Sequence, residues 1–157
     1  MDRELLYVFG TGNAAVTNLY NTCFALRDSD EYFMVDAGGG NGILKILDNM
    51  QVPIHRIHHI FVTHEHTDHI LGIVWMIRMI ATGMLKDQYQ GDAYIYCHED
   101  LVETIRTLCR LTIQEKHFRF LDSRIHLDPL KDGDHRQILS YDVTFFDIHS
   151  TKARQFG

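Results

Sequence analysis

The sequence predicts a mixed α/β protein with one domain over residues 1–157. The chain has 157 residues, a length that suits a single hydrophobic core. Short strand-like segments dominate its opening, and segments with helical spacing of apolar residues then alternate with further strands. That alternation is typical of α/β architectures. With 45% hydrophobic and 23% charged residues, the composition excludes a disordered or fibrous chain.

The opening of the chain predicts three strands, because β-branched, aromatic and other apolar residues are frequent there. The three strands cover residues 4–9, 22–26 and 32–35. A helix is predicted next over residues 43–50, where apolar residues recur at helical spacing after a glycine cluster at residues 38–42. Asn41 is its expected N-cap, and Pro53 lies beyond its end.

The middle of the chain predicts a buried strand followed by a long apolar helix. Residues 60–62 form a continuous apolar run, and residues 68–85 are the helical segment. The later elements are a strand over residues 93–96, a helix over residues 100–111 and a last strand over residues 141–148 that ends at His149. Residues 116–134 have a mixed pattern that predicts no regular element.

Charge and cysteine content narrow the class of protein. The net charge of −6 argues against nucleic-acid binding through a broad basic face. Arg78 interrupts the most apolar stretch, residues 70–85, which is shorter than the roughly 18 apolar residues of a membrane span. The start of the chain does not resemble a secretory signal, so we expect a cytoplasmic protein without a membrane segment. The three cysteines, with no CxxC pair, are expected to be reduced and buried; they are Cys23, Cys97 and Cys109.

Residues 63–69, with the sequence THEHTDH, have the residue types and density of a metal site. In an extended segment alternate side chains point the same way, so His64 and His66 can bind one ion. Asp68 and His69, at the turn into the helix, can face a second ion. The spacing is not HExxH, because position 68 is Asp, which excludes a helical zincin site.

Other patterns near the motif are weaker. Residues 10–15 fit GxGxxA, but the segment that follows is not helical, so a dinucleotide site is not expected. The glycine cluster lacks the Lys-Ser/Thr of a P-loop and is interpreted as a tight turn beside the site. His55, His58 and His59 are assigned to the loop and strand before the motif. His98 is a secondary candidate ligand after its strand.

The segments around the motif resemble the metallo-β-lactamase superfamily, whose hallmark is HxHxDH after a buried strand. Asp36 at a strand end matches the first motif of that superfamily, residues 63–69 match the second, and His149 matches the third. The opening residues 9–13 and the continuation at residues 70–72 resemble the ribonuclease Z branch.

The resemblance implies a four-layer αββα sandwich, of which this chain supplies the first half and the start of the second. It also implies two divalent metal ions, zinc in the first place with manganese or iron as alternatives. His64, His66 and His149 would bind the first ion, and Asp68 and His69 the second. Asp36 would tie the motif loop in place, and Asp68 would act in catalysis.

The function implied is a metal-dependent hydrolase, in the first place a phosphodiesterase like ribonuclease Z that uses a metal-bound hydroxide. The alternatives are a hydrolase of a small ester, amide, lactone or thioester, and a non-catalytic metal-binding or interaction domain. The expected partner is a phosphodiester substrate, for which RNA is one candidate, or a small-molecule substrate. Assembly into a homo-oligomer is an open alternative. In the superfamily the third motif is followed by an Asp that bridges the two metals and by a last His. Both would come after Gly157 in this sequence, so we expect a native chain that continues beyond this C-terminus.

Overall fold

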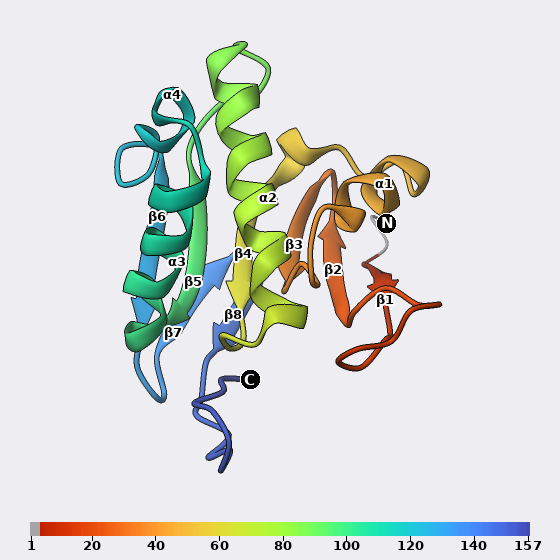
Figure 1. Ribbon diagram of the computed structural model, residues 1–157, viewed down its shortest axis with the longest axis vertical. Coiled ribbons are helices and arrows are strands. Elements are labelled where there is room, and N and C mark those ends of the chain that lie inside the picture. The colour runs from red at the N-terminus through yellow and green to blue at the C-terminus, as the bar shows by residue number, and fades with distance from the viewer. Residues whose placement is uncertain (1–3) are drawn as a thin grey trace.

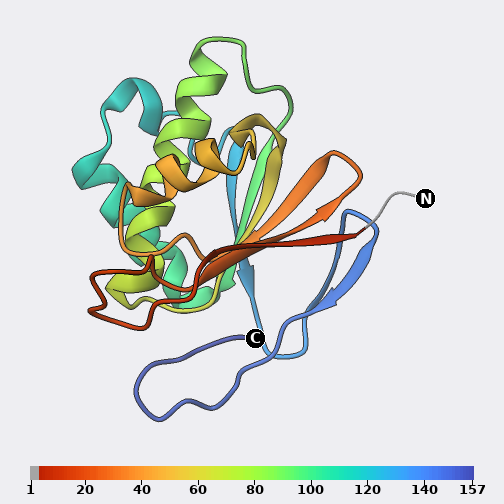
Figure 2. The ribbon, with the colours of Figure 1, turned by 90° about the vertical axis from the view of Figure 1, so that its right-hand side faces the viewer.

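The computed structural model describes residues 4–157 and contains a six-stranded mixed sheet with helices on one face (Figures 1 and 2). The strand order follows the chain order. The first three strands pair antiparallel, and the last four pair parallel. The strands are β1 (Leu5–Gly10), β2 (Cys23–Asp28), β3 (Glu31–Val35), β4 (Ile57–Val62), β5 (Ala93–His98) and β6 (Ile125–Leu130).

In the part of the chain that the structure describes, four α-helices connect the strands from β3 to β6. They are α1 (Gly42–Asn49), α2 (Thr67–Leu85), α3 (Glu99–Thr112) and α4 (Glu115–Phe118), and a short 3-10 helix covers Ile54–Arg56. Figure 1 shows α2 running along the middle of the sheet and α3 in front of β5 and β6. Parallel strands are joined by right-handed crossovers, here through helices, and the order β3-β4-β5-β6 runs in one direction, so all these helices fall on one face.

The main core lies between the sheet and the helices. Alternate side chains of the strands face the helices and are fully buried, such as Met34 on β3, Ile60 on β4 and Ile95 on β5. By length and apolar composition α2 could cross a membrane, but the core helix of a soluble protein passes the same test. One side of α2, which includes Ile73 and Ile77, is buried in this core.

The opposite face of the sheet is only partly covered. A two-stranded sheet of β7 (His135–Ile138) and β8 (Tyr141–Thr144) lies on that side (Figure 2). A second apolar cluster gathers beneath it; its buried members are Phe33, Phe61, Tyr96, Leu130, Ile138, Phe145 and Phe156. On β1, by contrast, Leu6 is 60% exposed and Val8 46% exposed. One α layer, one full sheet and the start of a second sheet are therefore present, as expected.

Most predicted elements are confirmed to within a few residues, but the last strand is shorter than expected and some elements were not predicted. The expected last strand does not extend to His149: β8 ends at Thr144, and Phe146 pairs instead with Gly157 through two backbone hydrogen bonds. Helix α4 and strands β6 and β7 were not predicted. For β6 the reason is an Asp-Pro pair, which is unusual within a strand. Pro129 is tolerated because β6 is the edge strand of its sheet. The cysteines are buried and unpaired, as predicted.

Candidate metal centre

The candidate site lies at the edge where the parallel strands β3 and β4 end. Asp36 directly follows β3, and the motif residues 63–69 directly follow β4 and lead into α2. The Asp36 N–H donates to the Phe61 carbonyl at 2.8 Å, which keeps the two strand ends together. Asp36 has a φ of 55°, a left-handed conformation that Asp tolerates better than most residues. The turn therefore directs the Asp36 side chain at the neighbouring motif.

The Asp36 carboxylate holds the motif in place. It is 4% exposed. Its Oδ1 accepts the backbone N–H of Thr63 at 2.9 Å, and its Oδ2 accepts the Thr63 hydroxyl at 2.7 Å. Oδ2 also lies 2.8 Å from Nδ1 of His69. These are the contacts expected of a residue that ties the motif loop in place, and they join β3, β4 and α2 at one buried point.

The motif histidines are packed together. The His64 ring centroid lies 4.7 Å from that of His66 and 4.1 Å from that of His69. His64 is buried, His69 is partly buried and His66 is exposed. Nδ1 of His64 lies 2.8 Å from the Thr63 hydroxyl oxygen. Three imidazoles therefore meet at the end of one strand, with one side of the group open to solvent.

Burial and charge act on two of these imidazoles in opposite directions. Burial, together with the neighbouring His69, lowers the pKa of His64 below its usual value. Burial also acts to lower the pKa of His69. The hydrogen bond to Asp36 and the charges of Asp36 and Asp68 outweigh it, so the pKa of His69 is raised. The neutral form that metal binding needs is thus favoured at His64.

Asp68 sits in the first turn of α2 and faces the loop after β1. Its Oδ2 accepts the backbone N–H of Ala14 at 3.2 Å and lies 3.4 Å from Nε2 of His69. The glycine cluster approaches closely: a Cβ on Gly39 would lie 3.7 Å from the Asp68 Cα and 2.7 Å from Oδ1 of Asn21. The tight turn interpreted beside the site is therefore found there.

His149 lies apart from the other predicted ligands. Its side chain is 83% exposed, and its Nδ1 lies 3.9 Å from Asp147. Within residues 4–157 no group of three or more His, Cys, Asp or Glu side chains is arranged to hold a metal ion. The nearby end of the chain does reach the motif, because the Phe156 N–H donates to the Thr63 carbonyl at 3.1 Å.

The donor chemistry of the motif nevertheless fits a divalent cation. Imidazole nitrogens and a carboxylate are the ligands that zinc, manganese and iron accept in proteins. Three imidazoles and the Asp68 carboxylate gather at one strand end, and the Nδ1 atoms of His64 and His69 are engaged by Thr63 and Asp36. Such outer contacts are usual for histidines that bind metals.

One buried histidine beside the motif had only a weak sequence signal. His98 ends β5, is almost fully buried, and has no hydrogen-bond partner at either ring nitrogen among residues 4–157. Its Nε2 lies 3.8 Å from a carboxylate oxygen of Glu65, which is part of the motif. The position of His98 at the carboxyl end of a strand next to β4 is the only feature of the sequence that could have indicated this proximity.

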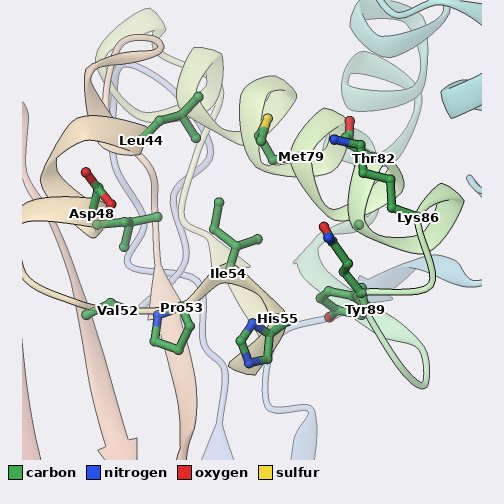
Figure 3. A pocket seen from close by; sticks show the side chains of 13 residues that line it. Leu44, Asp48, Val52, Pro53, Ile54, His55, Met79, Thr82, Lys86 and Tyr89 are labelled. Atoms are coloured by element: carbon green, nitrogen blue, oxygen red, sulfur yellow. The ribbon is translucent and has the colours of Figure 1, made fainter.

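A cavity elsewhere in the molecule does not belong to this site. It has a volume of about 390 Å³ and lies between α1 and the C-terminal half of α2 (Figure 3). Its lining is largely apolar, with Leu44, Ile54 and Met79 among the residues, and includes none of the predicted site residues. The chemistry of the motif is at the other end of α2, so this cavity does not define the candidate site.

Comparison with protein families identifies the chain. The family described as "Anti-Pycsar protein Apyc1" matches residues 5–156. The chain belongs to the Apyc1 family. Its residues alone had indicated the wider superfamily and a branch but not this family.

Curated relatives of this Apyc1-family chain include two bacterial proteins named ribonuclease Z. The one from Phocaeicola vulgatus is 29% identical over 102 residues, which cover 64% of this chain and 31% of the relative. The one from Parabacteroides distasonis is 25% identical over 130 residues, which cover 80% of this chain and 41% of the relative. The predicted resemblance to ribonuclease Z is confirmed, and the chain spans less than half the length of these relatives.

Solved structures show that the chain has the metallo-β-lactamase fold. The metallo-β-lactamase fold protein YhfI from Bacillus subtilis matches with a TM-score of 0.72 at 18% identity, over 96% of this chain and 56% of that protein. Human tRNase Z, short form, gives 0.71 at 20% identity, over 96% and 61%. A diphosphatase of the PhnP family gives 0.70 at 15% identity, over 99% and 63%. The predicted fold class is confirmed, and the chain corresponds to part of that fold.

Proposed function

We propose that this chain carries the metal-binding motif of a metal-dependent phosphodiesterase. The observation that carries the proposal is the gathering of His64, His66, His69 and Asp68 around the buried Asp36 carboxylate. The similarity to proteins named ribonuclease Z supports a hydrolase. The diphosphatase and tRNase Z neighbours favour phosphorus over carbonyl chemistry.

Each residue has a proposed role. His64, His66 and His149 would hold one divalent ion, and Asp68 and His69 a second. When bound, such ions activate water at neutral pH and stabilise the charge on an attacked phosphoryl group. Asp36 positions His69 and the motif loop. His149 fills its role only if the segment after β8 turns its imidazole toward β4.

Asp68 also has a favourable place for an anionic side chain. It lies in the first turn of α2, where the helix dipole stabilises negative charge. The Ala14 N–H donates to one of its oxygens and fixes the carboxylate toward His69. We propose that Asp68 accepts a proton from, or orients, the attacking water while it contributes a ligand.

The test uses the native gene product loaded with zinc or manganese and assayed on bis(p-nitrophenyl) phosphate, a nucleoside cyclic phosphate, a precursor transfer RNA and a lactone. Asp68→Asn keeps the side-chain shape but removes the charge, so we expect phosphodiester turnover to fall at least about 100-fold. Asp48→Asn, on the exposed surface of α1, is the matched control and should leave turnover unchanged.

Inactivity of the loaded protein on every phosphodiester would reject the proposal. Turnover of the lactone alone would indicate instead a hydrolase of small carbonyl substrates, in line with the β-lactamases among the structural neighbours. Stable metal binding without turnover of any of these substrates would favour a non-catalytic domain.

A further inference from the structure

Thr63 stands between the Asp36 carboxylate and the first histidine of the motif. Its hydroxyl oxygen lies 2.7 Å from Oδ2 of Asp36 on one side and 2.8 Å from Nδ1 of His64 on the other. Both distances are those of good hydrogen bonds. The same Oδ2 also lies 2.8 Å from Nδ1 of His69. One carboxylate oxygen is thus linked to two imidazoles, directly in one case and through a hydroxyl in the other.

Only one placement of the hydrogen atoms is consistent with these three hydrogen bonds. An ionised carboxylate can only accept hydrogen bonds, and a threonine hydroxyl has one hydrogen to donate. The Thr63 hydrogen must point at Asp36, because otherwise two acceptor oxygens would face each other at 2.7 Å. The Thr63 oxygen can then only accept from His64, so Nδ1 of His64 must carry a hydrogen. Nδ1 of His69 must carry one by the same reasoning.

We propose that Thr63 is a positioning residue that passes the orienting effect of Asp36 on to His64. With the hydrogen of each ring on Nδ1, the neutral form of His64 and of His69 offers the lone pair of Nε2 to a metal ion. Asp36 and His64 are both more than nine-tenths buried, so bulk water does not replace the hydroxyl as a partner. The inference rests on the proposed function only where it says that the tautomer serves metal binding. The tautomer itself is a property of the metal-free protein.

The hydrogen bonds of Thr63 to Asp36 and His64 also explain why a threonine fits at the end of β4. Its backbone N–H donates to Oδ1 of Asp36 while its hydroxyl donates to Oδ2, so one residue engages both oxygens. Its carbonyl accepts the N–H of Phe156. A valine would keep the shape and both backbone hydrogen bonds but would leave Nδ1 of His64 and Oδ2 of Asp36 without this partner.

The first measurement is nitrogen-15 NMR of the His64 ring in the metal-free protein above pH 7.5, where an imidazole whose pKa is lowered from about 6.5 is neutral. We expect the Nδ1–H tautomer at His64 in the unmodified protein and in Thr63→Ser, which keeps the hydroxyl. In Thr63→Val the His64 signal should move toward the tautomer mixture of a free imidazole. Thr82→Val removes a hydroxyl in α2 that bonds only to Arg78 and should change nothing at His64.

The second measurement is zinc affinity by competition with a chelator. Loss of a partner that orients a metal ligand typically costs 10–100-fold in affinity, so we expect a loss of that size in Thr63→Val and less than about threefold in Thr63→Ser. An Nε2–H tautomer at His64 in the unmodified protein would overturn the inference, and that result needs no variant to fold. Retention of the Nδ1–H tautomer in Thr63→Val would overturn it as well. Inactivity toward phosphodiesters with the tautomer as expected would instead count against the proposed function alone.

Discussion

At the scale of single residues, the first histidine of the motif is the one most fully built into the fold. His64 is 7% exposed, touches the rings of His66 and His69, and has its Nδ1 engaged by Thr63. We expect His64→Ala to remove most bound metal, measured as metal per protein by elemental analysis. His55→Ala, an exposed histidine before β4, is the control and should keep full stoichiometry. Unchanged metal content in His64→Ala would contradict its place among the ligands.

A second residue-scale prediction concerns His59, on the face of β4 away from the helices. Burial, with a smaller contribution from His58, lowers the pKa of His59 to about 4. The unfolded chain has a value near 6.5, so it binds more protons than the fold between these limits. The stabilising effect is therefore complete above about pH 6.5 and is lost as the pH falls toward 4.

The measurement is the free energy of unfolding by urea at pH 7 and pH 5, in the unmodified protein and in His59→Asn. Since the ring is only partly buried, we expect the unmodified protein to lose on the order of 1 kcal/mol more than the variant between these two values. An equal loss in both proteins would show that His59 titrates normally in the fold.

At the scale of elements, the contact that places α2 against the sheet depends on one glycine. The Gly72 N–H donates to the Gly38 carbonyl at 2.8 Å, and a Cβ on Gly72 would lie 1.9 Å from the Ala37 carbonyl oxygen. Backbone atoms cannot move aside as a flexible side chain can. Gly72→Ala should therefore destabilise the fold by about 1–3 kcal/mol or more, measured by thermal or urea unfolding.

Gly40→Ala provides the contrast, because an added Cβ there meets nothing within 4 Å. We expect a change within about 0.5 kcal/mol. Gly72→Ala should also lower metal binding, since it pushes the start of α2, and with it Asp68 and His69, away from Asp36. Equal stability of the two variants would mean that α2 is not held by this approach.

Local patterns predicted the elements that carry the site, and the reason is visible in this packing. Strand β4, the motif and α2 follow one another without interruption, so apolar periodicity and the spacing of histidines were sufficient. Contacts between distant parts of the chain were not predictable: Tyr20, whose hydroxyl lies 2.9 Å and 2.8 Å from the carbonyl oxygens of Ala37 and Gly40, has no local signal. Strand β6 was missed because its side chains do not alternate cleanly and it contains a proline. The end of β8 was misplaced because the backbone partner of Phe146 is Gly157, which no local pattern indicates.

At the scale of the whole molecule, the two faces of the large sheet differ in how well they are covered. The helix face is covered by the helices of the main core. On the opposite face Leu6 and Val8 of the edge strand β1, with Phe24 of β2, line a shallow apolar hollow. An exposed apolar patch beside an unpaired edge favours association with another surface. We expect the 157-residue protein to self-associate in sedimentation experiments.

The double variant Leu6→Thr with Val8→Thr should reduce that association, because each buried apolar Å² is worth about 25 cal/mol. Leu111→Thr is the control: Leu111 is 76% exposed on α3, on the helix side of the sheet. A monomer in all three proteins would show that the apolar hollow has no role in association.

The parallel pairing of β3 with β4 also sets the order in which the site can form during folding. Strands β1, β2 and β3 are neighbours in sequence and pair antiparallel, so their contacts close short loops. The two hydrogen bonds that Thr63 donates to the Asp36 carboxylate join positions 27 residues apart, across α1. Closing that longer loop costs more chain entropy and slows the step. A partly folded chain with only its first three strands therefore has no anchored motif, and a metal ion captured at that stage would meet histidines whose rings are still free to turn.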